Sequence, residues 1–376
     1  MAEEGRPVSG DVSENGQDLR AAAEVRYADE MARLAADDNS PKPAGWHLSP
    51  RAVRRFILGD SKAGVSRKFY GDDPLVDRAI VSLMSRQGLM LVGEPGTAKS
   101  MLSELLGAAI SGTSALVVQG SAGTNEDHLR YGWNYALLLS EGPSERALVP
   151  SPVLNAMRSG RIVRFEEITR CPPEVQDALI SILSEKSLAL PELGADRIEN
   201  AKPGFNIIAT ANLRDRGVHE MSSALKRRFN FETVHPIDDP KFEKELVLKQ
   251  LAERLQPEAV QVRGAEDVAE LLVRTFQDLR KGRTDEGASL NRPDAVMSTA
   301  EAVNVLHAAA LEAAYLDDGK LGGGHVARQL QGVVLKDSPD DGKKLRAYVE
   351  HIARERAARS ATWKEFYTAA RALKLG

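Results

Sequence analysis

The sequence GEPGTAKS at residues 93–100 combines the parts of a phosphate-binding loop. A polyphosphate is bound by converging backbone N–H groups, by the start of a helix behind them and by a cation at the outer phosphates. Lys99 would contact the β- and γ-phosphates of a nucleotide, and the Ser100 hydroxyl would bind Mg²⁺. The residues expected to surround the nucleotide are Gly93, Glu94, Pro95, Gly96, Thr97, Ala98, Lys99, Ser100 and Met101.

The loop departs at Ala98 from the strict pattern, in which glycine precedes the lysine. Alanine removes no backbone N–H and is favourable at the start of a helix. It therefore costs stability only if the loop needs a positive φ at this position. By itself, the stretch also fits an ordinary strand, turn and helix with an incidental lysine.

Two adjacent acids, Glu166 and Glu167, follow a second apolar stretch. Phosphoryl transfer to water needs one carboxylate to hold Mg²⁺ and another to orient or deprotonate the water, so we assign Glu166 to the metal and Glu167 to the water. Because a strand alternates its faces, both can act only where the strand ends and the backbone turns. The pair equally fits the solvated start of a helix. Arg164, inside the same stretch, has no explanation from the sequence.

Four further polar side chains flank apolar stretches. Asn212 follows one and could hydrogen-bond the attacking water. Arg227 and Arg228 precede another and could reach the γ-phosphate of a neighbouring subunit. Arg292 is predicted to open a helix and to close onto the phosphates. Each alone also fits a turn residue, a solvated charge or a cap, but their order predicts that the whole series meets at one edge of a sheet.

The pattern of the chain predicts how these residues are positioned. Apolar stretches at 88–93, 115–119, 161–166, 205–211 and 229–234 alternate with helical stretches, which predicts a parallel sheet covered on both faces. Beyond residue 237 only helical periodicity remains. The expected divisions are an amino-terminal tail and helix at 1–45, an αβα nucleotide-binding domain at 46–236, a helical domain at 237–318 and a helical extension at 319–376.

Composition narrows the class of protein. A net charge of −4 over 376 residues argues against a basic nucleic-acid-binding surface over the whole molecule. The single cysteine, Cys171, suits a reducing compartment, and no run of about 18 apolar residues suggests a membrane span. The polar, acidic residues 1–17 are predicted to be disordered and carry no signal-peptide core. These features predict a cytoplasmic protein that does not enter a membrane.

Taken as a set, the motifs resemble those of the AAA+ ATPases, and among them the MoxR family. GEPGTAKS resembles the MoxR form of the Walker A loop, in which alanine before the lysine is a familiar variant. IVRFEEITRCPPEVQ resembles the Walker B strand with Glu166 in the usual place of aspartate, and IIATAN resembles sensor 1. ALKRRF resembles the arginine-finger segment, in which Arg228 fits the pattern better than Arg227, and Arg292 resembles the sensor 2 residue of the lid.

The resemblance covers about residues 66–315 and implies an AAA+ αβα sandwich with a five-stranded sheet and a helical lid. It also implies ATP and Mg²⁺ as cofactors and a homo-oligomeric, hexameric ring that remodels a protein client, often beside a von Willebrand factor A-domain partner. The segment between Gln119 and Pro150 resembles the family's helix-2 insert, and residues 187–204 resemble its pre-sensor-1 hairpin. Two alternatives remain open: a nucleotide-gated binding module with little hydrolysis, and a nucleic-acid motor.

Overall fold

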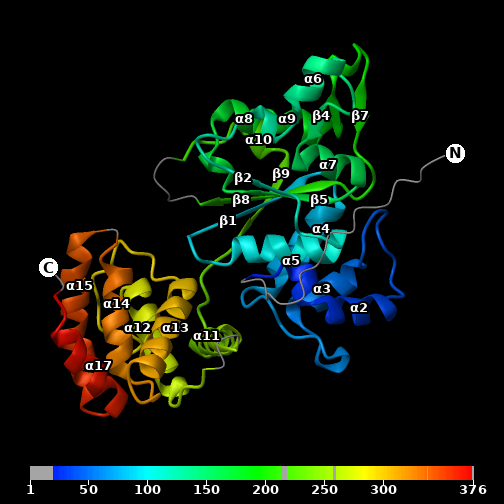
Figure 1. The fold of residues 1–376 in the computed structure, drawn as a ribbon. Helices are drawn as coiled ribbons and strands as arrows, with labels where there is room; N and C mark the ends of the chain where they lie inside the picture. The colour runs from blue at the N-terminus through cyan, green and yellow to red at the C-terminus, as the bar shows by residue number, and fades with distance from the viewer. Residues whose placement is uncertain (1–19, 213–217, 257–259, 337, 375–376) are drawn as a thin grey trace.

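A parallel sheet forms the centre of the amino-terminal half of the chain (Figure 1). Its strand order is β2-β5-β8-β1-β9, with every neighbouring pair parallel. The strands are β1 Gly88–Gly93, β2 Val117–Gln119, β5 Ile162–Glu166, β8 Asn206–Asn212 and β9 Phe229–Thr233. This confirms the predicted five-stranded parallel sheet and each of the five apolar stretches assigned to it, within residues 20–212, 218–256, 260–336 and 338–374, which the computed structural model describes.

The sheet is covered on both faces because its apolar side chains alternate. Leu89 and Leu91 of β1 belong to one hydrophobic cluster, and Met90 and Val92 belong to the other. The first face packs against helices α4 Asp73–Met84 and α5 Lys99–Ser111, and α3 Pro50–Leu58 packs on these two helices. The second packs against α7 Pro152–Ser159, α8 Pro173–Asp177, α9 Leu179–Glu185 and α10 Ser223–Lys226. Figure 1 shows α5 on one side of the sheet and α7 and α8 on the other.

The amino-terminal helical segment packs onto its own chain. The helix predicted within residues 1–45 is interrupted at Tyr27, giving α1 Ala23–Arg26 and α2 Ala28–Ala36. The interruption lets α1 pack on α5 while α2 packs on α3. Ser49 caps α3, Pro50 opens it and Gly59 ends it. The predicted disorder of residues 1–17 lies outside the described residues.

Two small antiparallel pairs project from the α/β body. β3 Tyr131–Trp133 pairs with β4 Leu148–Pro150, and α6 Tyr135–Glu141 lies between them. β6 Ser187–Ala189 pairs with β7 Ile198–Asn200, which confirms the hairpin predicted within residues 187–204. Figure 1 places α6, β4 and β7 together at the end of the α/β body that is remote from the carboxyl-terminal helices.

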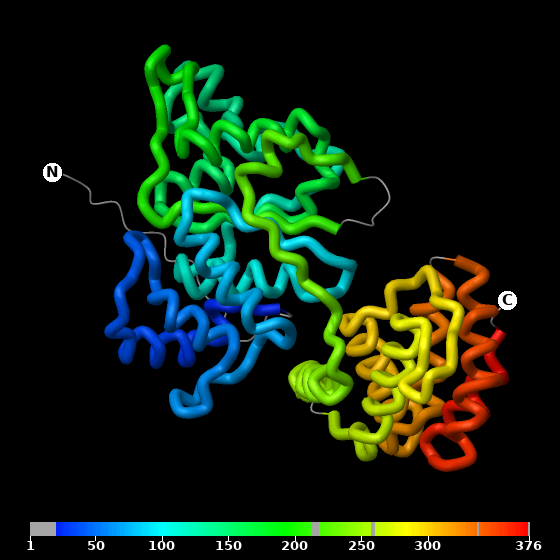
Figure 2. The backbone as a smooth tube through the Cα atoms, turned by 180° about the vertical axis from the view of Figure 1, so that it is seen from behind, coloured from blue at the N-terminus to red at the C-terminus, as the bar shows by residue number. Residues whose placement is uncertain are grey.

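The carboxyl-terminal helices share one hydrophobic cluster, whose members run from Val247 to Ala370. The boundary expected between residues 318 and 319 therefore falls inside one continuous core. The helices are α11 Pro240–Leu255, α12 Ala265–Lys281, α13 Thr299–Tyr315, α14 Gly323–Val334, α15 Pro339–Tyr348, a π-helical turn Val349–Ala353, α16 Arg354–Ala357 and α17 Ala361–Arg371. Figure 2 shows this helical body beside the α/β body, joined through the chain that leads into α11. Among the described residues, no helix combines the length and apolar character needed to cross a membrane.

Candidate nucleotide-binding site

The phosphate-binding loop lies between β1 and α5, as its sequence predicts. Ala98 is the residue before the helix and has φ +68° and ψ +23°, in the left-handed region. The condition under which alanine costs stability here is therefore met. The Lys99 Nζ donates to the carbonyl oxygens of Gly93 and Glu94, at 3.1 and 2.7 Å. These bonds hold the lysine at the mouth of the loop, where an anion would meet it.

A cavity of about 490 Å³ opens at this loop, and residues Pro95–Met101 form one wall. Glu167, Thr210 and Asn212 line it from the ends of neighbouring strands, because β5 and β8 are adjacent in the sheet and Asn212 pairs with Gly93 in register. The remaining lining comes from Arg20, Tyr70, His235, Pro236, Ile237, Leu246, Gln250, Arg254, Thr299, Ala300 and Val303. The predicted loop, base and amide therefore share one cavity.

Glu166 is buried below the loop, with 5% of its surface exposed. Its Oε2 accepts hydrogen bonds from Ser100 Oγ at 2.7 Å and from Thr210 Oγ1 at 2.8 Å, and its Oε1 accepts from Ser103 Oγ at 2.6 Å. Burial alone raises the pKa of Glu166, but these hydrogen bonds and the nearby charge of Arg164 outweigh it and lower the pKa. The carboxylate is thus ionised and directly joined to the loop hydroxyl.

Glu167 follows the last residue of β5, at the point where the backbone turns. Glu167 has φ +56°, and its N–H donates to Thr210 Oγ1 at 3.0 Å. This confirms that the two acids lie where the strand ends and the backbone turns. The Glu167 carboxylate forms an ion pair with Arg170 Nε at 2.7 Å. The carboxylate expected to act on water is therefore held by a neighbouring cation.

Thr210 and Ser103 also take part in this arrangement, although the sequence motifs do not identify them as site residues. Thr210 precedes Asn212 by two residues in β8, and Ser103 follows Ser100 by three residues in α5. The spacings of two in a strand and three in a helix place each beside its partner on one face. That periodicity is the signal that identifies them.

The start of α13 closes over the phosphate-binding loop. Ser298 caps α13 and exchanges hydrogen bonds with Glu301. A Cβ added to Gly96, whose φ is +75°, would lie 2.3 Å from Ser298 Oγ, so only glycine lets the loop and the helix approach this closely. The loop and the helical body therefore meet at the cavity.

Arg292 does not open a helix, and that prediction is wrong. α13 begins at Thr299, where the Ser298–Glu301 capping box starts it, and the Asp341 carboxylate holds the preceding segment through the N–H groups of Asp294 and Ala295. Arg292 Nη2 instead donates to the Lys281 carbonyl oxygen at 2.7 Å.

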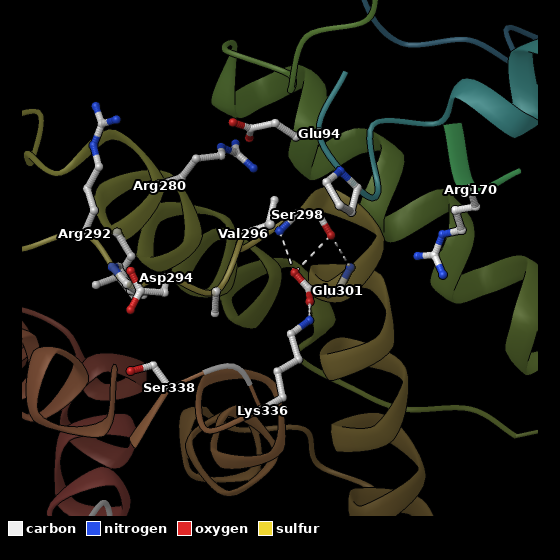
Figure 3. Close-up of a pocket in the computed structure, with 14 residues that line it drawn as sticks. Glu94, Arg170, Arg280, Arg292, Asp294, Val296, Ser298, Glu301, Lys336 and Ser338 are labelled. Atoms are coloured by element: carbon white, nitrogen blue, oxygen red, sulfur yellow. Dashed lines mark hydrogen bonds and ion pairs between the residues drawn. The ribbon is translucent and has the colours of Figure 1, made fainter. Parts of the chain in front are cut away.

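Arg292 lines a second cavity of about 800 Å³ beside the first (Figure 3). Glu94, Arg170 and Arg280 line the same space, and Lys336 forms an ion pair with Glu301 at its base. The helical body instead contributes Arg254, at the end of α11, to the cavity that contains Lys99. Arg254 Nη1 donates to Asn304 Oδ1 at 2.8 Å.

Arg227 and Arg228 lie at the amino-terminal ends of the strands, whereas the phosphate-binding loop lies at their carboxyl-terminal ends. The prediction that the whole series meets at one edge of the sheet is therefore wrong for these two residues. They precede β9, and the Arg228 carbonyl oxygen accepts from Gly88 N–H at 2.9 Å, beside the start of β1. Arg228 is anchored within its own chain by Ser184 Oγ at 3.0 Å and the Ala224 carbonyl at 2.8 Å, whereas Arg227 is exposed.

Comparison with known proteins matches both halves of the chain. Residues 88–229 match the family described as AAA domain (dynein-related subfamily), and residues 241–374 match the YehL-like AAA+ ATPase C-terminal domain. A protein named YehL from Escherichia coli strain K12 is 49% identical over 357 residues, which cover 95% of this chain and 98% of that protein. The protein SH1500 of Staphylococcus haemolyticus is 31% identical over 168 residues, 44% of this chain and 62% of its own length.

Among solved structures, the chain is similar to NtrX from Brucella abortus, which was determined in complex with ADP. The TM-score is 0.44 and the identity 12%, over 80% of this chain and 64% of that one. The family relationship rests on the sequence matches, which are much stronger than this likeness.

Proposed function

This chain belongs to the YehL-like family of AAA+ ATPases, and we propose that it binds ATP with Mg²⁺ and hydrolyses the γ-phosphate. The observation that supports the proposal is the convergence of Lys99, Glu167 and Asn212 on one cavity, with Glu166 hydrogen-bonded to Ser100 directly behind it. A phosphate-binding cation, a metal-facing carboxylate and a water-facing carboxylate are the groups that hydrolysis requires.

The chain's own residues fit Mg²⁺. Ser100 and Glu166 offer the hydroxyl and carboxylate oxygens that this hard cation prefers. Within the described part of the chain, no group of three or more His, Cys, Asp or Glu residues could hold a metal ion alone. This agrees with an ion that is held by few protein ligands and by the phosphates. Mg²⁺, when bound, would offset charge on the β- and γ-phosphates.

Glu167 is the proposed general base, and Asn212 is proposed to orient the water from the neighbouring strand end. The Glu167 carboxylate forms an ion pair with Arg170. We infer that this pair must loosen before Glu167 can accept a proton from the water.

The position of Arg227 and Arg228 supports a ring. These residues lie at the amino-terminal edge of the sheet, away from the cavity of their own chain, so they are proposed to complete the site of a neighbouring copy. We propose a hexameric ring of MoxR type on this basis and on the motif resemblance. Hydrolysis in the ring would remodel a protein client, with a von Willebrand factor A-domain protein as partner.

The client-facing surface is proposed at the end of the α/β body formed by α6 and the two small hairpins. Large apolar side chains are exposed there: Tyr135, Leu139, Val149 and Ile198. Figure 1 shows their elements, α6, β4 and β7, side by side. Cys171 is buried and unpaired with another cysteine, which suits the cytoplasmic location that we also propose.

The test is the Glu167→Gln variant, measured for both ATP binding and steady-state phosphate release. We expect binding to be retained and turnover to be lost, because the amide keeps the shape of the side chain but cannot accept the proton. Equal, negligible turnover in wild type and variant under ring-forming conditions would instead favour the nucleotide-gated binding module. Salt-dependent binding to DNA would favour the nucleic-acid motor.

Mixing variants tests the ring. An Arg227→Ala, Arg228→Ala double variant should bind ATP without turnover. Mixing it with Glu167→Gln chains should restore part of the activity, because an intact Glu167 then meets intact arginines at hybrid interfaces. No recovery at any mixing ratio would contradict action between subunits.

A further inference from the structure

Arg164 is a buried cation beside the proposed metal site, and the proposed function gives it no role. It lies two residues before Glu166 in β5, so both side chains project from the same face of the strand. Arg164 is 8% exposed, and its Nη2 donates to Glu166 Oε1 at 2.8 Å. A charged side chain at this place in a central strand requires partners, because burying an unpaired charge is costly.

The guanidinium nitrogens also bind α5 and the segment that follows it. Arg164 Nε donates to Ser103 Oγ at 3.0 Å, and Nη1 donates to the Ser114 carbonyl oxygen at 3.1 Å. Nη2 also reaches the Ser100 carbonyl oxygen at 3.3 Å. Arg164 is therefore fixed in one orientation, with its charge against Glu166.

Both oxygens of Glu166 are fully engaged. Oε1 accepts from Ser103 and Arg164, and Oε2 accepts from Ser100 and Thr210. Two acceptor bonds at each oxygen use all four lone-pair directions of a carboxylate. A ligand or a metal-bound water can approach Glu166 only by replacing one of these donors.

We propose that Arg164 is a positioning residue that holds Glu166 Oε1 and offsets the carboxylate charge. It thereby reduces the factor by which Mg²⁺ strengthens nucleotide binding. The inference rests on the proposed function, because it concerns the same nucleotide site. It also accounts for glutamate at position 166. The side chain must reach Ser103 and Arg164 with one oxygen while it keeps Ser100 with the other.

The measurement is the ratio of nucleotide affinities with Mg²⁺ and with EDTA, using a fluorescent ATP analogue. Removing the fixed positive charge in Arg164→Met should raise this ratio about tenfold, because a cation no longer opposes Mg²⁺. Arg164→Lys keeps the charge but loses the several N–H donors of the guanidinium group, so it should give an intermediate ratio. The matched control is Arg356→Met, which breaks a buried ion pair with Asp278 in the helical body and should leave the ratio unchanged.

Arg164→Met leaves the Glu166 carboxylate buried without its cation, and this could unfold the variant. A second comparison avoids that problem. In a Glu166→Gln background, Arg164→Met removes the last charge of the pair, and it should again raise the Mg²⁺ ratio. Equal ratios with and without Arg164 in this background would overturn the inference. A wild-type chain that binds no nucleotide under either condition would instead contradict the proposed function.

Discussion

Replacing Ala98 with glycine should stabilise the protein, although the same substitution in a helix normally destabilises. Ala98 has φ +68°, and the left-handed conformation costs an L-residue about 1–2 kcal/mol. Glycine avoids that cost but loses about 0.5–1 kcal/mol of additional backbone entropy on folding. The expected net gain is therefore about 0–1.5 kcal/mol, which corresponds to a rise of up to about 6 °C in the midpoint of thermal unfolding.

The assay is thermal unfolding of the nucleotide-free protein, with Ala32→Gly as the matched control. Ala32 is an exposed residue inside α2, in right-handed helical conformation, so the same change there should lower stability by about 1 kcal/mol. The two variants should thus shift the midpoint in opposite directions. A fall in Ala98→Gly as large as that in Ala32→Gly would refute the left-handed conformation at position 98.

Three other predictions concern the cavity and one buried lysine. Lys99→Ala should weaken ATP affinity tenfold or more, because it removes charge-assisted hydrogen bonds, and unchanged affinity in a nucleotide titration would contradict the phosphate-binding loop. Arg254→Ala should weaken ATP affinity more than Arg292→Ala, because only Arg254 lines the cavity with Lys99; the reverse order would support the original assignment of Arg292. Lys186 has a buried Nζ with no hydrogen-bond partner among the described residues, and burial lowers its pKa to about 8. The unfolded chain keeps this proton up to about pH 10.5, so Lys186 should make the free energy of unfolding rise between about pH 8 and 10.5. Lys186→Met should abolish that rise and increase the free energy of unfolding at pH 7 by about 1–3 kcal/mol, as measured by denaturant unfolding.

The sheet and the phosphate-binding loop were predictable because their signals are local. Each strand is a short apolar stretch between helical stretches, and the loop chemistry lies within eight consecutive residues. The acids at 166 and 167 were placed correctly because strand alternation allows only the carboxyl end for both. The start of α13 was misplaced because apolar spacing continues upstream of the Ser298–Glu301 capping box, which alone marks the true start.

Apart from Glu166 in its own strand, the partners of Arg164 were not predictable from one sequence, because they come from other segments of the chain. Ser103, Ser114 and Glu166 converge on this side chain only after α5 has packed on β5. The sequence shows the anomaly, an arginine inside a central strand, but the donor and acceptor geometry that stabilises it is a property of the packed fold.

The edge of the sheet at which each arginine lies decides how the proposed site could be completed. The cavity is lined by Arg20 and Arg254, which are engaged by Glu104 and Asn304 respectively. Arg227 and Arg228 lie beside the start of β1, whereas the phosphate-binding loop follows its end, and a six-residue strand separates the two by about 20 Å. An arginine side chain cannot span that distance. If Arg227 or Arg228 acts in hydrolysis, it must therefore act on the nucleotide of another copy, and activity should depend on protein concentration wherever the proposed ring dissociates.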